Sequence, residues 1–155
     1  MEYQVRDARI TDVERIHALV EAAELMRPNE ARAPLGAVDL LRQLVYLPNA
    51  VVLVADARRT IVGAAVLALR PSVIEGGMVG TLDLLVVDPA YATAGVVDSL
   101  LNESLRSARN KGCVNVEATP PTDPAERARW IGHDFVDAGP RIVRDLAPAG
   151  AARDR

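Results

Sequence analysis

The sequence predicts a mixed α/β domain in which a mostly antiparallel central sheet carries helices on both faces. Two apolar runs at residues 51–55 and 60–69 flank a polar turn, which is typical of a β-hairpin, and a third run at 78–87 follows a Gly-Gly turn. Segments with helical spacing of apolar residues lie before the hairpin and after the third run. A chain of 155 residues is long enough for one hydrophobic core.

The first part of the chain predicts a strand followed by two helices. Residues 3–8 alternate in polarity, which indicates an outer strand. Thr11, with Glu14 three residues later, fits a capping box that begins the first helix. Residues 37–47 repeat apolar side chains at the spacing of a second helix. Between them, residues 26–36 are rich in proline and arginine and are expected to form a loop.

The stretch after the third apolar run has the pattern of an anion site. The run ends at Asp88-Pro89, a loop of small residues closes at Gly95, and an amphipathic helix is expected from there to about Lys111. The first N–H groups of a helix lack partners and point outward, so a glycine-bearing loop before a helix favours anion binding. We therefore expect the function to reside here.

The last part of the chain predicts a strand, a short helix and a final strand. These are expected at residues 115–118, 125–131 and 142–146. Residues 147–155 are rich in alanine and arginine and are expected to be a disordered tail. The prediction is thus one domain over residues 1–146, with the order β-α-α-β-β-β-α-β-α-β.

Composition excludes several classes of protein. The net charge is −3 and only 3% of residues are aromatic, so nucleic-acid binding is not expected. No apolar run approaches the roughly 20 residues of a membrane span, and the N-terminus lacks a secretory pattern, so a cytoplasmic location is expected. Cys113 is the single cysteine and His17 has no second ligand at metal spacing, so no metal site is expected.

Residues 80–101, GTLDLLVVDPAYATAGVVDSLL, resemble the cofactor-binding core of the GNAT family of N-acetyltransferases. The shared pattern is L-x-x-L-x-V-x-P, a loop, a glycine and an apolar helix. Its residues here are Leu82, Leu85, Val87, Pro89, Gly95, Leu100 and Leu101. The resemblance covers about residues 3–146. It implies the family's fold and transfer of an acetyl group from acetyl-CoA to a primary amine of a small molecule or peptide.

The resemblance also implies a cofactor site. In the family this strand parts from its neighbour at a bulge, pantetheine enters the gap, and loop amides bind the pyrophosphate. The corresponding positions here are Leu85, Val86, Val87, Ala92, Thr93, Ala94, Gly95, Val96 and Val97. The family usually has Arg or Gln at the position of Ala92 and Gly or Ala at that of Val97. A charge-assisted phosphate contact is therefore missing from the loop, whereas backbone donors and the helix dipole remain.

The candidate general bases are Thr81 and Asp83, at positions where the family often has Glu, Asp or His. Strand periodicity places Thr81, Asp83 and Leu85 on one face. Asp83 lies in an apolar run, and burial raises a carboxyl pKa unless the group is paired, so it is the better candidate. The alternative is that Asp83 forms a structural ion pair, for instance with Arg6 or Arg70.

Other candidates come from the C-terminal part and the first loop. Trp130 stands where the family has a tyrosine acid, and an indole N–H can donate a hydrogen bond but is no acid at neutral pH. His133 is either a substitute acid or a residue of a surface turn. Glu30 and Arg32 are acceptor-substrate candidates because the family's first loop lines that side, or they belong to a solvated loop.

Two functions fit these residues. The first, which we favour, is an acyl-CoA-dependent N-acetyltransferase. The second is a degenerate member of the family that keeps the fold but not catalysis and acts as a ligand-binding or regulatory module, as the missing arginine, second glycine and tyrosine suggest. A homodimer is a candidate assembly, because an exposed strand edge near residues 141–145 would tend to pair.

Overall fold

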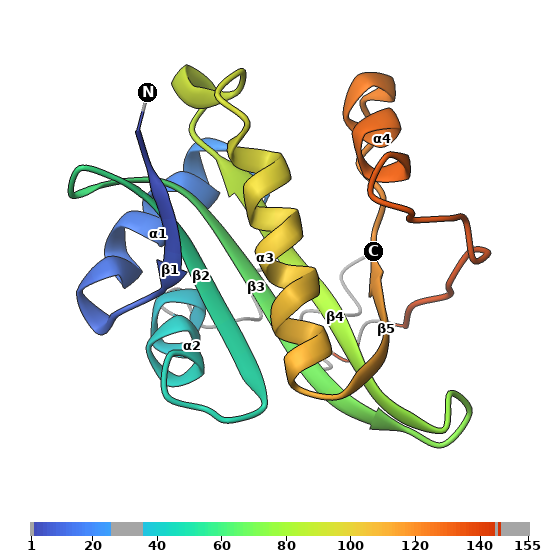
Figure 1. Ribbon diagram of the computed structural model, residues 1–155. Helices are drawn as coiled ribbons and strands as arrows, with labels where there is room; N and C mark the ends of the chain where they lie inside the picture. Colours follow the sequence, from blue (N-terminus) through green and yellow to red (C-terminus); the bar gives the residue numbers. More distant parts are fainter. Residues whose placement is uncertain (1, 26–35, 145, 147–155) are drawn as a thin grey trace, which may run out of the picture.

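The computed structural model describes residues 2–25, 36–144 and 146 (Figure 1). Within them, no helix is long and apolar enough to cross a membrane. The elements in chain order are β1 (Gln4–Asp7), the 3-10 turn η1 (Ile10–Asp12), α1 (Val13–Ala22), α2 (Gly36–Leu44), β2 (Ala50–Ala57), β3 (Thr60–Ser72), β4 (Gly77–Val87), the 3-10 turn η2 (Pro89–Tyr91), α3 (Val96–Asn110), β5 (Cys113–Ala118) and α4 (Pro124–Ile131).

The five strands form one sheet in the order β1-β2-β3-β4-β5. All neighbours are antiparallel except β4 and β5, which run parallel. A parallel pair requires a crossover connection, and α3 supplies it. The mixed, mostly antiparallel sheet expected from the sequence is confirmed.

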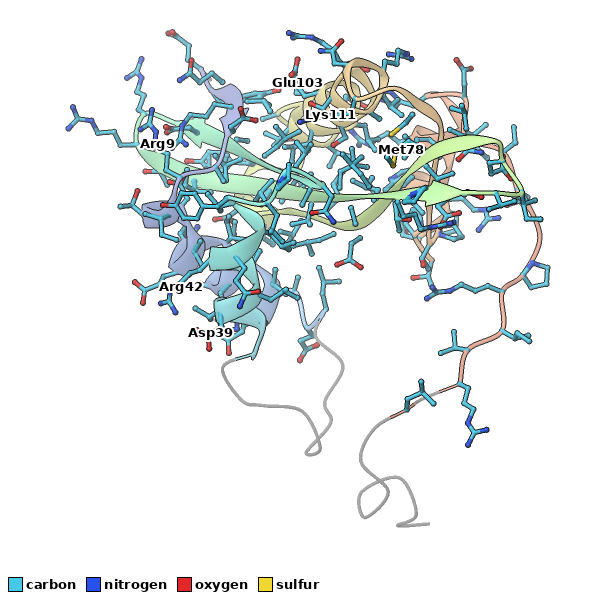
Figure 2. The ribbon with its side chains drawn as sticks, turned by 90° about the horizontal axis from the view of Figure 1, so that it is seen from below. Arg9, Asp39, Arg42, Met78, Glu103 and Lys111 are labelled. Atoms are coloured by element: carbon cyan, nitrogen blue, oxygen red, sulfur yellow. The ribbon has the colours of Figure 1, made fainter. Side chains whose placement is uncertain are left out.

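Helices cover the two faces of the sheet unequally. Figure 2 shows α1 and α2 on one side, with Asp39 and Arg42 on their outer surface, and α3 on the other side, where Met78 lies. Figure 1 shows α1 and α2 behind β1 to β3, whereas α3 crosses in front of β3 and β4. Each layer encloses a core, the α1/α2-side core and the α3-side core. On the α1/α2 side, β5 is therefore left without a helix among the described residues.

Alternation along β3 builds the two cores. Leu67 and Leu69 belong to the α3-side core, whereas Val66 belongs to the α1/α2-side core. On α3, Leu100 is completely buried. At Gly63 a Cβ atom would lie 3.1 Å from Leu100 Cδ1, and equally near Val96 and the Val86 carbonyl oxygen. A side chain at this position would therefore force α3 and its neighbours to move by a few tenths of an ångström, and glycine allows the close approach without that shift.

The first helix begins later than the capping pattern predicted. It starts at Val13, after the η1 turn, and the preceding carboxylate of Asp12 accepts hydrogen bonds from Arg9 N and Arg6 Nη1, both at 2.8 Å. Arg6 also contacts Asp56 at 3.2 Å. Arg6 of β1 thus joins Asp56 of β2 to Asp12 at the start of α1, which the Thr11 cap could not do.

The final strand predicted at residues 142–146 is absent from the described part of the chain. Residues 135–144 and 146 form neither helix nor strand, and the Ile142 side chain is fully exposed. An apolar run becomes a strand only where a neighbouring strand accepts its backbone hydrogen bonds, and here it finds none. The expected disordered tail, residues 147–155, lies outside the described residues. The homodimer stays a prediction.

Candidate active site

A β-bulge in β4 lies at the point where this strand parts from β5. The register pairs Leu82 with Leu67 and Leu84 with Val66, so within this strand pair Asp83 falls between two partners on β3. The pairing of β4 with β5 ends at Leu82 and Ala118. From Asp83 onward β4 continues along β3 and leaves β5. We call this point the β4–β5 parting, and the parting implied by the family resemblance is present.

Two backbone amides face the parting. Asp88 N donates to Val62 O at 2.8 Å, and donors of successive strand residues point to opposite edges. Val86 therefore directs its amide toward β3, whereas the amides of Leu85 and Val87 point to the edge that β5 has left. Of the three strand residues predicted to contact the cofactor through their amides, two have the required orientation and Val86 does not.

Asp88 holds the turn that follows β4. Its Oδ1 accepts a hydrogen bond from Ala90 N at 3.0 Å, and its Oδ2 accepts one from Arg15 Nη2 of α1 at 3.1 Å. Pro89 begins the η2 turn. The strand end, the loop and the first helix are thereby tied to one carboxylate, so the loop leaves the sheet in a fixed direction.

The loop then delivers backbone donors to the start of α3. Gly95 has φ +80°, a left-handed conformation that favours glycine, and precedes the first helical residue. The amides of Val96 and Val97 have no backbone partner among the described residues, as expected at a helix N-terminus. The side chain of Val97 is buried in the α3-side core. Its branched side chain therefore lies away from the loop surface.

The bulge also overturns the predicted grouping of side chains on β4. Leu82, Leu85 and Val87 belong to the α3-side core, whereas Leu84 and Val86 face the α1/α2 side. Before the bulge even-numbered residues face α3, and after it odd-numbered residues do. The prediction that Thr81, Asp83 and Leu85 share one face is therefore wrong for Leu85. Thr81, adjacent to Leu82, lies on the side away from α3.

Asp83 fits neither environment proposed for it. Its residue surface is exposed, so the expected burial is wrong. Arg6 pairs with Asp12 and Asp56, and Arg70 Nη2 lies 3.3 Å from the carboxylate of Glu117. Since both arginines are engaged by other carboxylates, the ion-pair alternative with them is also wrong. The role of Asp83 as a base stays a prediction.

Glu117 is a candidate that the sequence reasoning missed. Thr81 Oγ1 donates to Glu117 Oε2 at 3.1 Å, and Arg70 contacts the same carboxylate. Its neighbours Val116 and Ala118 pack on the α3-side core, so Glu117 points to the opposite face. The alternation of apolar and polar residues at 116–118 could have predicted that Glu117 faces away from the core. Its position beside Thr81 could not be predicted, because that depends on the register of β5 with β4.

The α4 candidates lie on the α3 side of the sheet. Trp130 packs against the α3-side core and its ring centroid is 5.1 Å from that of Phe135. His133 lies in the turn that follows α4, and its Nε2 is 2.8 Å from Asp98 Oδ1 of α3 with 15% of the side chain exposed, so its role as a substitute acid stays a prediction. Thr81 lies on the other face. The structure therefore does not gather the four predicted catalytic residues on one surface. Glu30 and Arg32 lie outside the described residues.

Comparison with known proteins agrees with this architecture. A predicted acetyltransferase from Clostridium acetobutylicum, solved with acetyl-CoA, superposes with a TM-score of 0.75 at 14% identity, covering 94% of this chain and 97% of that one. Glucosamine-6-phosphate N-acetyltransferase from Arabidopsis thaliana gives 0.73 at 12% identity, covering 94% and 99%. At these identities the two structures establish the fold alone.

Sequence comparison extends this result. A glucosamine 6-phosphate N-acetyltransferase from Trypanosoma brucei brucei is 40% identical over 57 residues, which are 36% of this chain and 39% of that protein's length. The model of the acetyltransferase (GNAT) family matches residues 16–129, more than half of the 155 residues. The match includes the bulged strand, the loop and α3. This chain belongs to the GNAT family of acetyltransferases.

Proposed function

We propose that this protein transfers the acetyl group of acetyl-CoA to a primary amine of a small molecule or peptide. The observation that carries the proposal is the β4–β5 parting at Asp83, placed directly before the Gly95 loop and the N-terminus of α3. This arrangement puts outward-facing strand amides and helix-terminal amides in one continuous stretch of backbone. Both kinds of donor suit the polar parts of an acyl-CoA.

The residues present fit acetyl-CoA. When bound, it supplies a thioester carbonyl as the electrophile. The amides of Leu85 and Val87 would polarise that carbonyl, since both point to the open edge of β4. The amides of Val96 and Val97 would hold the pyrophosphate, and the buried side chain of Val97 leaves their approach open. The loop needs no side-chain charge for these contacts.

An amine acceptor reaches the protein mainly as an ammonium ion and must lose a proton before it attacks. Asp83, exposed at the bulge, is the proposed base. Glu117 of β5 lies in the same region, where Thr81 of β4 and Arg70 of β3 hold its carboxylate, and its oxygens would be further acceptors for the ammonium group. The leaving thiolate would take its proton from water or from His133, because the Trp130 indole is not an acid.

Calorimetric titration of acetyl-CoA and free CoA tests the cofactor site. We expect micromolar binding, and binding that stays undetectable at millimolar ligand would contradict the proposal. Gly95→Ala should weaken binding because it distorts the loop. Gly112→Ala is the matched control, since Gly112 has φ +83° at the other end of α3 and no atom within 4 Å of an added Cβ. Both substitutions strain the backbone similarly, but only one lies at the site.

Acetylation assays then separate an enzyme from a binding module. The amines screened should include glucosamine 6-phosphate, because a relative is named for that activity, with mass spectrometry of the product as the readout. Asp83→Asn should lower turnover by about 10²-fold or more while acetyl-CoA affinity stays constant. Equal turnover in the variant would remove Asp83 from the mechanism. CoA binding without acetylation of any amine would favour the ligand-binding alternative.

A further inference from the structure

A cluster of charged side chains joins α3 to α4. Asp98 Oδ2 lies 3.2 Å from Arg129 Nη1, and Asp98 Oδ1 lies 2.8 Å from His133 Nε2. Arg129 Nη2 is also 3.5 Å from Glu126 Oε2 on its own helix. The side chains of Arg129 and His133 are 30% and 15% exposed. The cluster is thus half-buried between the two helices.

The position of Asp98 places this cluster at the proposed phosphate site. Asp98 is in the first turn of α3, three residues after Gly95. A carboxylate there stabilises the helix but opposes an anion that would bind the same N-terminal amides. Arg129 touches that carboxylate directly, so its guanidinium lies within about one helical turn of the loop.

Arg129 has donor capacity that the protein does not use. A guanidinium carries five N–H donors. Its Nη1 and Nη2 groups face Asp98 and Glu126, whereas its Nε is buried and has no hydrogen-bond partner among the described residues. A buried donor without a partner is unfavourable. An acceptor would reach this Nε only after the Arg129 side chain turns toward the loop, and the missing partner lowers the cost of that movement.

We infer that Arg129 supplies, from α4, the charge-assisted phosphate contact that the loop lacks at Ala92. This inference rests on the proposed function, because it assigns a residue to the cofactor site. Arg129 would both contact the pyrophosphate and offset the charge of Asp98 beside it. Asp98 is a positioning residue, because its contact with Arg129 holds α4 against the first turn of α3.

Two substitutions at one ion pair test the inference, because a purely structural role and a phosphate contact predict different signs. Arg129→Gln removes the cation and should weaken CoA binding by roughly 10-fold to 100-fold. Asp98→Asn breaks the same ion pair but removes a negative charge, so CoA should bind as well as before or more tightly. Titration of pantetheine, which lacks the phosphates, should give the same affinity in all variants.

Arg127→Gln is the matched control, since Arg127 lies on the same helix and pairs with Asp137 in solvent. Thermal unfolding of each variant monitors folding. If wild-type protein binds CoA and Arg129→Gln binds it equally well, the inference is wrong and the proposed function survives. If Arg129→Gln and Asp98→Asn lose affinity equally, Arg129 is only structural. Failure of the wild-type protein to bind CoA would overturn both proposals.

Discussion

Two halves of the sheet are held together by different forces. The packed half, formed by β1 to β4 with the segments η1 and α1 to α3, encloses the two apolar cores, and β3 is buried from Ile61 to Leu67. The edge half, formed by β5 and α4, has little buried surface, and none of the eight residues of α4 is buried. Its side-chain contacts include the ion pairs of Arg70 with Glu117 and of Arg129 with Asp98.

The two halves contribute different groups to the proposed site. The packed half presents the backbone donors, which must keep their geometry to be effective. The edge half presents charged side chains through ion pairs, and partly exposed ion pairs each contribute little to stability. We therefore expect the loop and α3 to be rigid, and α4 to adjust its position when a ligand enters between it and α3.

The largest expected effect comes from truncating the packed half. Leu100→Ala removes a fully buried side chain and should lower the free energy of unfolding by about 2–5 kcal/mol. Ile131→Ala on α4, where the side chain is 59% exposed, should change it by less than about 0.5 kcal/mol. Urea denaturation measures both. Similar losses in the two variants would contradict the division into halves.

A smaller effect is expected at the contact of α3 with β3. Gly63→Ala should cost about 1–3 kcal/mol, because the new methyl group would press on Leu100, Val96 and a backbone carbonyl. Combining it with Leu100→Ala removes one of those neighbours, so the double variant should lose less than the sum of the single losses. Strict additivity in urea denaturation would show that α3 moves freely over the sheet.

The two halves should also differ in how much an ion pair contributes to the free energy of unfolding. Burial acts to raise the pKa of Asp12, but hydrogen bonds from Arg6 and the Arg9 amide outweigh it and hold this pKa below its usual value. The stabilisation is then complete above the unfolded pKa, near 3.9, and is lost as pH falls through the lower folded value. Asp12→Asn should therefore cost about 1.5 kcal/mol at pH 7.

The control is Asp137→Asn, which breaks an exposed ion pair of the edge half and should cost under about 1 kcal/mol. Unfolding free energies measured from pH 7 down to about 2 should show the Asp12→Asn deficit shrinking in acid. A deficit that is independent of pH would mean that the carboxylate charge of Asp12 is not what stabilises the fold.

The smallest expected effect is on the reactivity of the Cys113 thiol, which can be measured without any change in stability. Cys113, the first residue of β5, packs partly against the α3-side core, and burial raises the pKa of its thiol. Its thiolate fraction at pH 8 is therefore lower than that of an exposed cysteine, and it should react more slowly with a disulfide reagent. Urea should remove the difference. Reaction as fast as that of a free thiol in native protein would indicate that the edge strand opens readily.

Much of the fold and of the loop followed from local sequence. The helix expected from the Gly95 loop to about Lys111 is observed as Val96–Asn110, and glycines with positive φ lie directly at its start and just past its end. The hairpin and the strand that follows it were also placed within a few residues. Caps, turns and helical spacing depend on neighbours in the sequence, so they can be read from the sequence.

The site was predicted less completely because its geometry arises between strands. A bulge exists only relative to a partner, so the face of Leu85 and the exposure of Asp83 depended on the register with β3. Glu117 became a neighbour of Thr81 through parallel pairing across a long connection, and the final strand failed for lack of a partner.

The sequence by itself thus determined the family, the order of elements through α4 and the loop that presents donors, because these reside in short patterns. Which charged side chains form ion pairs was decided by tertiary structure alone. Asp98 and Arg129 are 31 residues apart and unremarkable in the sequence, yet the packing of α4 beside α3 places a cation at the helix start. Long-range electrostatics depends on distances in space, and only the folded chain sets those distances.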